Sequence, residues 1–516
     1  MQSSHCIYLL SGLLALTATS AFAQDSSALI DALVKKGVLS GKEAEEIRAD
    51  MTKESANNSA EKIKLSNSVT ELKLYGDLRL RYQYDHRDAQ VDPAPVGVHQ
   101  DRNEDDRSPS GTQRSRFRFR LRLNADFRLT ENFFGGVELQ TAQASDSGNQ
   151  TFEDGFDDYN IFISKAFIGY SVAPWMTVLA GKFANPFYTT DLVYDSDLNP
   201  TGIAQSIAFH KMVGGGGRAA EAGYSKDGKS VAAAQDAAAE PNWELTLNAG
   251  QFIFDDNIEG AGPDNDLSTD AFLFHTQLVG AYKFGNGSKL TLAPGWLTYV
   301  NGAVGGVAGG GLRNENSFND RDNPADDDSK VRFADVSGAT RNLNIVLLPG
   351  DYSFKIGSLK AKVLWDFAYN IEGRKRVEDI YNMVSLRAPA GDGAVDPDDF
   401  DKQHTNQDDY AYMIGVLLGE NKKKGDWSVL ANWRQTGLGA VDPNLNDSDF
   451  ALGELNTRGT KLSVGYSFTD FAVGAITWYH AWNLRDTLAG GEATGGNAVA
   501  DASVVDVLQV DFAFKF

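Results

Sequence analysis

The 516-residue sequence contains a single cysteine, Cys6, which lies in a segment that we expect to be removed on export. Ile7–Leu16 is mostly apolar, and Ala21–Ala23 (Ala-Phe-Ala) matches a signal-peptidase site. Residues 1–23 are therefore predicted to be a secretory signal peptide, although they contain neither Lys nor Arg. The mature chain would then have no cysteine, which excludes a disulfide-rich secreted scaffold.

Two further shortages limit the class of protein. After residue 23 no apolar run reaches the length of a membrane-spanning helix, about 18 residues, so a membrane-embedded form would cross as strands. Positive charge is also scarce, because 48 Lys and Arg against 70 Asp and Glu give a formal net charge of −22. This balance argues against nucleic-acid binding, which requires a basic surface.

The most informative stretch is Arg114–Leu129, in which apolar and polar residues alternate. A period of two is typical of a β-strand with one apolar and one polar face. Here the apolar face carries Phe117 and Phe119, and the polar face carries four successive arginines, Arg116, Arg118, Arg120 and Arg122. This arrangement suits a membrane β-barrel with lipid outside and water inside, but a soluble antiparallel strand with a solvated face would show it too.

The chain from residue 70 to 516 favours the barrel. Tight turns such as Ala173–Trp175 alternate with long loops, 436–459 among them, which is the asymmetry of an outer-membrane barrel with its long loops outside. We predict an all-β fold, a transmembrane antiparallel β-barrel of about 16 strands with one polar face each and both termini on the periplasmic side. This count treats Pro349–Gly357 as a short connector and the Gly- and Ala-rich residues 212–242 as a long periplasmic connection.

Residues 24–69 differ from the rest and are predicted to be a periplasmic helical hairpin and linker. Asp25 or Ser26 can cap a short amphipathic helix that ends at Gly37. Ser40 and Glu43 have the spacing of a capping box for a second helix. The alternative is a loosely ordered leader.

The last strand ends the chain on an aromatic residue. Leu508, Val510, Phe512, Phe514 and Phe516 alternate with other residues. A final amphipathic strand with a terminal phenylalanine resembles the signal that the barrel-assembly machinery recognises. This machinery is therefore an expected partner of the strand that ends at Phe516.

A segment in the middle of the chain resembles a known family. Gly181–Phe187 (GKFANPF), followed by Asp191–Asp195 and Asp197–Pro200, is similar to the strand-to-loop segment of the bacterial "putative porin" family, relatives of the phosphate-selective porins. The helical leader is similar as well, so the resemblance covers nearly the whole mature chain, although only these segments are specific.

The resemblance implies passive diffusion of small hydrophilic solutes through a homotrimer in the outer membrane of a Gram-negative bacterium. It also implies that one loop folds into the barrel to narrow the pore. The candidate is residues 188–204, and its polar and aromatic members are Asp191, Tyr194, Asp195, Asp197 and Asn199.

Inside such a pore the arginine face could have either of two roles. Lining the lumen, Arg79, Arg81, Arg116, Arg118, Arg120 and Arg122 would attract anions such as carboxylates or phosphates. Alternatively, Asp77, Asp126, Glu138 and inward-facing acids of the loops would pair with these arginines and leave little net charge. Lys360 and Lys362 add some positive charge to the expected lumen.

Several long loops are acidic: Asp255–Asp270, Asn319–Asp328 and Asp392–Asp409. They are expected either to form a solvated surface or to bind divalent cations that bridge to lipopolysaccharide phosphates. Outer-membrane lipid and lipopolysaccharide are therefore expected partners.

No motif predicts a catalytic, metal or cofactor site. Gly223–Ser230 matches the P-loop pattern but lacks the buried strand that must precede it. Asp442–Asn446 begins like a calcium loop, but Asp447 stands where glycine is needed. Two alternatives to a porin are a barrel enzyme, for which no nucleophile and base are visible, and a structural tether that links the outer membrane to the cell wall through residues 25–69.

Overall fold

The computed structural model describes residues 34–36, 40, 42–45, 66–89, 112–129, 132–142, 148–152, 158–213, 241–255, 271–300, 342–378, 405–484 and 502–516. The chain divides into two units, Met1–Asn67 and Ser68–Phe516. Within these described ranges, no helix is both long enough and apolar enough to cross a membrane.

In the first unit, the predicted capping box is present. The Ser40 backbone N–H donates to Glu43 Oε2 at 2.9 Å, and the Glu43 backbone N–H donates to Ser40 Oγ at 3.3 Å. The Ser40 backbone N–H and the Ser40 hydroxyl, which donates to Glu43 Oε2 at 2.7 Å, lower the pKa of the Glu43 carboxyl. The signal peptide and most of the helical hairpin lie outside the described residues, so they stay predictions.

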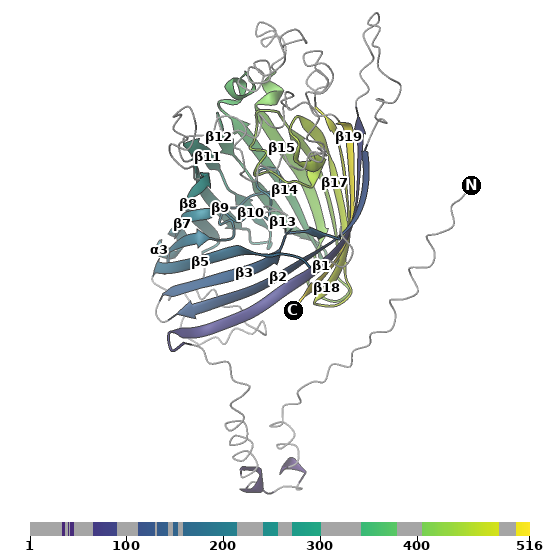
Figure 1. Ribbon diagram of the computed structural model, residues 1–516. Coiled ribbons are helices and arrows are strands. Elements are labelled where there is room, and N and C mark those ends of the chain that lie inside the picture. The colour runs from purple at the N-terminus through teal and green to yellow at the C-terminus, as the bar shows by residue number, and fades with distance from the viewer. Residues whose placement is uncertain are drawn as a thin grey trace, which may run out of the picture. The chain divides into compact units, whose positions relative to one another are not determined.

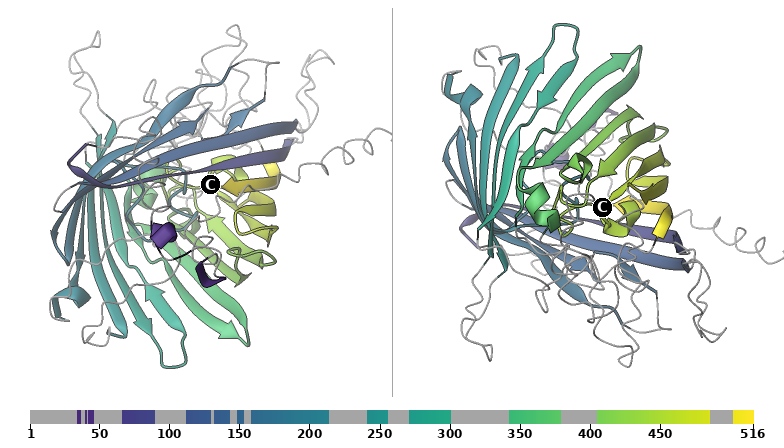
Figure 2. Two further views of the ribbon diagram at one scale, coloured as in Figure 1. Left: turned by 90° about the horizontal axis from the view of Figure 1, so that it is seen from below. Right: turned by 90° about the horizontal axis from the view of Figure 1, so that it is seen from above.

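The second unit is one antiparallel sheet (Figures 1 and 2). Its segments are β1 (Val69–Ala89), β2 (Thr112–Leu129), β3 (Phe133–Thr141), β4 (Gln150–Thr151), β5 (Ile161–Ala173), β6 (Met176–Lys182), β7 (Thr201–Ala208), β8 (Trp243–Asp255), β9 (Ala271–Lys283), β10 (Lys289–Leu292), β11 (Gly295–Val300), β12 (Asn344–Leu347), β13 (Gly350–Ile356), β14 (Leu359–Asn370), β15 (Tyr410–Gly419), β16 (Trp427–Thr436), β17 (Thr457–Ser467), β18 (Ala472–Asn483) and β19 (Ala502–Lys515). Short helices of this unit include α3 (Phe209–Val213), η5 (Asn406–Asp408) and η6 (Phe450–Gly453), and residues 373–378 are helical as well.

Three of these nineteen segments continue another strand, so the described wall has sixteen strands, as predicted. β4 follows β3 along β2, β10 and β11 both pair with β9, and β12 and β13 both pair with β14. β1 pairs with both β2 and β19, which closes the barrel. Gly76 and Phe516 exchange backbone hydrogen bonds at 2.9 and 3.1 Å, so the chain ends in this closing seam.

Two prolines explain the interrupted strands. Pro294 separates β10 from β11 and Pro349 separates β12 from β13, because proline has no N–H to donate to a sheet ladder. The two breaks face each other, since the Ala293 N–H donates to the Pro349 carbonyl at 2.9 Å. The prediction that Pro349–Gly357 is a connector is wrong, because most of it is β13. The turn lies instead at Gly357, whose φ of 62° suits glycine.

The connections differ at the two ends of the barrel. Short turns at 174–175, 285–287, 357–358, 420–426 and 468–471 define what we call the turn end, where β1 begins and β19 ends. The loops at 183–200 and 437–456 define the loop end. The connection from β7 to β8 begins at the turn end with α3, as the strand count predicted, and its residues 214–240 lie outside the described ranges.

The two faces of the wall are chemically distinct. The apolar face of β1 and β2 points outward, since Leu74 and Phe117 are each 63% exposed. Arg81, Arg118 and Arg120 alternate with these residues and are buried on the inner face. The predicted orientation of the arginine strand is therefore confirmed.

Aromatic side chains mark both edges of the outward apolar band. Tyr466, Phe468, Phe471 and Phe512 are exposed near the turn end, and Trp478 is exposed toward the loop end. Aromatic rings at both edges are typical of a barrel wall in a bilayer.

Candidate functional site

The inner face of β1 and β2 brings the six predicted arginines together. Their register places Arg79 opposite Arg120 and Arg81 opposite Arg118, while Arg122 lies opposite Asp77. Directly opposite residues on antiparallel strands have Cβ atoms only about 5 Å apart, so like charges there repel each other. This face requires carboxylates nearby to be stable.

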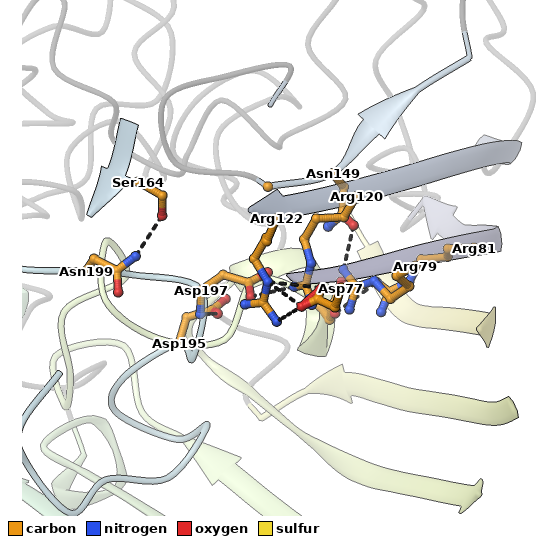
Figure 3. A network of polar contacts seen from close by, with 12 residues as sticks. Asp77, Arg79, Arg81, Arg120, Arg122, Asn149, Ser164, Asp195, Asp197 and Asn199 are labelled. Atoms are coloured by element: carbon orange, nitrogen blue, oxygen red, sulfur yellow. Dashed lines mark hydrogen bonds and ion pairs between the residues drawn. The ribbon is translucent and has the colours of Figure 1, made fainter. Parts of the chain in front are cut away.

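Five carboxylates supply that compensation, some of them visible in Figure 3. Asp77, Asp85 and Asp511 belong to β1 and β19, whereas Asp197 and Asp449 come from loops. The ion pairs are Arg122–Asp77 (2.6 Å), Arg120–Asp77 (3.6 Å), Arg120–Asp197 (2.9 Å), Arg116–Asp85 (3.0 Å), Arg81–Asp511 (2.7 Å) and Arg81–Asp449 (3.4 Å).

Two arginines of the face have amide partners. Arg79 Nη2 donates to Asn149 Oδ1 at 2.5 Å, and Arg118 Nη1 donates to Gln83 Oε1 at 3.2 Å. Arg79 forms no ion pair with any residue that the structure describes. Among the described residues, five carboxylates and two amides therefore contact the six arginines.

The predicted neutralising acids fare unequally. Asp77 pairs with two arginines, as expected. Glu138 instead pairs with Lys165 at 3.0 Å, and Asp126 accepts a hydrogen bond from the Tyr75 hydroxyl at 2.8 Å. The expected inward-facing loop acids are Asp197 and Asp449, although the sequence did not identify Asp449 as one of them. The sequence reasoning missed Asp511, which is far from the arginines in sequence and meets Arg81 only when the barrel closes.

Electrostatics hold the two loop carboxylates in the charged form. Burial alone would raise the pKa of Asp449, but Arg81, Arg79 and Arg118 lower that pKa to about 2. Burial likewise opposes ionisation of Asp197, whose pKa is nevertheless lowered by Arg120, Arg79 and Arg122. Both loops are thus attracted to the arginine face.

Residues 183–200, which we call the first loop, cross the interior of the barrel. On one side Asp197 pairs with Arg120 of β2, and on the other the Tyr188 hydroxyl bonds to Asp351 of β13. β2 is the second and β12–β13 the tenth of the sixteen wall strands, so these walls are opposite each other. The Thr190 hydroxyl adds a bond of 2.6 Å to Asp366 of β14.

The predicted constriction-loop residues mostly hold this loop in place. Asp191 pairs with Lys461 of β17 at 2.6 Å, and Asn199 donates to Ser164 Oγ of β5 at 2.8 Å. Tyr194 is 5% exposed in an apolar cluster. Of the candidate range 188–204, residues 201–204 belong to β7, so the infolded part ends at Pro200.

A second loop, residues 437–456, also folds inward, so the prediction that the connection 436–459 lies outside is wrong. The Asp195 N–H donates to the Leu445 carbonyl at 2.6 Å, and the Asp447 N–H donates to the Asp191 carbonyl at 3.1 Å. Ser448 donates from its N–H and Oγ to Asp195 Oδ2 at 3.2 and 3.3 Å. The two loops therefore pack as one body.

Two cations of the barrel wall anchor this body. Arg434 of β16 donates to the Asp191 carbonyl at 3.2 Å and lies over the Phe450 ring at 4.6 Å. Lys461 lowers the pKa of Asp191 against the effect of burial. The composition of the second loop gives a usable sequence signal, because its Leu438, Val441, Leu445, Phe450 and Leu455 differ from the acidic loops.

The loops also change the character of the inner wall. Phe252, Leu273, Leu297 and Ile345 point inward and are at most 2% exposed, packed with Phe183, Leu192 and Val193 of the first loop. A polar inner face on every strand was predicted, and this is wrong for β8, β9, β11 and β12. Their inner faces are apolar where the loops pack on them, next to the buried polar residues Asn248, His275 and Gln277.

The arrangement is a water-facing barrel partly closed by infolded loops that meet a charged wall. A family described as "Putative porin" matches residues 40–334 and 319–516. The chain belongs to this porin family. The porin is thus a channel of the outer membrane that works by passive diffusion, not an enzyme.

Solved porin structures show distant similarity to this chain. Salmonella typhi OmpF in complex with daunomycin has 10% identity and a TM-score of 0.41, over 88% of this chain and 100% of that one. Pseudomonas putida OprB at high pH has 8% identity and a TM-score of 0.41, over 86% and 94%. A triple mutant of Rhodopseudomonas blastica porin has 11% identity and a TM-score of 0.35, over 86% and 100%. No curated protein matches the sequence.

Proposed function

We propose that small hydrophilic solutes pass between the arginine face of β1–β2 and the body formed by the two infolded loops, with a weak preference for anions. The charge balance of this wall supports the proposal. Among the described residues, six arginines meet five carboxylates, and Arg79, which bonds to the Asn149 amide and forms no ion pair with them, is half-buried rather than fully buried. A small excess of positive charge favours entry of anions.

Single-channel recording tests both parts of this proposal. Purified protein in a planar bilayer should give open-channel steps, and their absence would contradict diffusion through the pore. In a salt gradient, Arg79→Gln should lower the anion-to-cation permeability ratio about two- to fourfold, from the loss of one screened unit charge. Arg128→Gln is the matched control, because Arg128 lies at the turn end of β2 and its one ion pair among the described residues is with the exposed Glu71. An unchanged reversal potential in Arg79→Gln would contradict the anion preference.

We propose further that the porin is a homotrimer with its long loops on the cell surface and that the strand ending at Phe516 is recognised by the barrel-assembly machinery. Support comes from family membership and from the outward aromatic residues Phe512, Phe514 and Phe516 near the turn end. Native mass spectrometry of the detergent-solubilised protein tests the trimer, and a monomer mass alone would contradict it. Deleting Phe516 should reduce the amount of folded barrel in the membrane.

A further inference from the structure

The outward face of β16–β19 carries a polar and aromatic patch toward the loop end of the barrel. These strands lie side by side at the C-terminal end of the sheet (Figure 1). The outward direction is fixed by Leu462, Val464 and Ile476, which are 42 to 54% exposed. Arg458 lies on the same face of β17 as Leu462, four residues nearer the loop end, and is paired with Trp482.

Among the described residues, no carboxylate pairs with the charge of Arg458. Its side chain forms no ion pair or hydrogen bond with any residue in the described part of the chain, and its Nε is buried without a partner. Its guanidinium lies 5.8 Å from the centroid of the Trp482 ring. Asp506, an acid on the same face of β19, is instead bonded to Trp478 Nε1 and His480 Nδ1, both at 2.9 Å.

Four aromatic rings form a ladder beside Arg458. Ring centroids are 5.4 Å apart from Trp478 to His480 and from His480 to Trp482, and 5.5 Å apart from Trp482 to Trp433. The ladder is fixed at both ends, by Asp506 and by the Tyr412 hydroxyl, which accepts from Trp433 Nε1 at 3.3 Å. Fixed aromatic faces of this kind are suited to contact with the C–H face of a sugar ring.

The position of the patch selects the ligand. Below it, Leu462, Val464 and Ile476 continue the exposed apolar band that faces lipid chains. Arginine next to such a band is costly unless it lies at headgroup level and meets an anion. The patch therefore matches the parts of a phosphorylated glycolipid. Its guanidinium suits a phosphate, its aromatic ladder suits a sugar, and the apolar surface below suits acyl chains.

We propose that Arg458 and the ladder of Trp433, Trp482, His480 and Trp478 bind the headgroup of a phosphorylated glycolipid in the outer leaflet. Arg458 holds a phosphate, the ladder contacts the sugar, and acyl chains cover Leu462, Val464 and Ile476. The site goes beyond solute passage and relies only on the barrel lying in the membrane with its long loops outside. It needs no divalent cation, in contrast to cation bridging by acidic loops.

Lipid binding to the purified full-length porin in detergent tests this site. The probes are an acylated glucosamine disaccharide bisphosphate, the same lipid without phosphates, and inorganic phosphate, each with EDTA present. Wild-type protein should bind the bisphosphate lipid at least tenfold more tightly than the dephosphorylated one. Arg458→Gln should lose about tenfold in affinity for the bisphosphate lipid, as expected for one charged hydrogen bond. Trp482→Leu should weaken binding of both lipids.

Controls separate binding from folding. Arg128→Gln, at the opposite end of the wall, should bind like wild type, and the heat-dependent mobility of each folded barrel on a gel should be unchanged. The site would be refuted by equal affinity of wild type and Arg458→Gln for the bisphosphate lipid, or by binding that disappears with EDTA. Competition by inorganic phosphate at equal concentration would refute a lipid ligand. If Arg458→Gln instead separated the subunits while lipid binding stayed the same, the patch would be a contact between copies of the chain.

Discussion

Removing the two loop carboxylates from the arginine face should make the pore strongly anion-selective. Asp449 pairs with Arg81 at 3.4 Å and Asp197 with Arg120 at 2.9 Å. Changing both to Asn keeps their shape and removes two of the five carboxylates that face six arginines. Arg81 would still have Asp511 as a partner, and Arg120 would share Asp77 with Arg122.

The size of the effect follows from Coulomb's law. A unit charge about 6 Å from a permeating ion in water contributes roughly 0.7 kcal/mol, and screening at 0.1 M salt reduces this to about 0.4 kcal/mol. That energy favours an anion and disfavours a cation about twofold each. The permeability ratio should therefore rise about fourfold for one carboxylate and about sixteenfold for both, and the rise should largely disappear near 1 M salt.

The assay is the reversal potential in a tenfold KCl gradient across a planar bilayer. Asp449→Asn, Asp197→Asn and the double variant are compared with Glu71→Gln, which removes a carboxylate that is 54% exposed at the turn end. A reversal potential that does not change in the double variant, or moves toward cation preference, would show that these carboxylates do not mask the arginines.

Three further outcomes are expected. Thr190→Val removes the 2.6 Å bond to the buried Asp366, worth about 1.5–3 kcal/mol, so single-channel current should become noisier than in the exposed Thr70→Val control. Gly419 has φ 77° and its added Cβ would meet the Trp427 carbonyl, so Gly419→Ala should lower the melting temperature by several degrees, whereas Gly285→Ala, with open space around it, should not. Burial, opposed by Lys461 and aided by nearby acids, raises the pKa of Asp447 to about 7. Because the fold favours the neutral carboxyl, thermal stability should fall as pH rises from about 4 to about 7, between the ordinary pKa of an aspartate and the raised pKa of Asp447, and Asp447→Asn should flatten this dependence.

Local periodicity was sufficient to predict the wall of the barrel. The alternation in β2 predicted which residues face lipid, because a strand reverses side-chain direction at every residue and the two solvents differ sharply. It failed at β13, where Pro349 looked like the start of a turn. A proline can also lie at a break within a strand when the neighbouring strand is broken at the same level, as it is here at Pro294. That match depends on how the two strands pair, so one strand's sequence does not reveal it.

The site could be predicted only in part, because its contacts join distant segments. The six arginines of β1 and β2 are visible in the sequence as a pattern. Asp511 and Asp449, the partners of Arg81, are not, because their positions follow from barrel closure and from the path of the second loop. The inward Leu273, Leu297 and Ile345 show the same limit. On a strand, an apolar residue is compatible with lipid on one face or with a packed loop on the other, and periodicity alone does not say which.

The infolded loops give this barrel a core of its own, and that core determines how the pore is bounded. Sixteen strands enclose more space than wall side chains can fill. The first and second loops occupy part of it by burying Phe183, Leu192 and Phe450, while β1 and β2 keep their charged face. The charges that remain on each side of the passage therefore belong to different elements, arginines to the wall and carboxylates partly to the loops. If the body formed by the two loops moved away from the wall, the pore would widen and Arg81 and Arg120 would be unmasked together, so conductance and anion preference should change in the same direction.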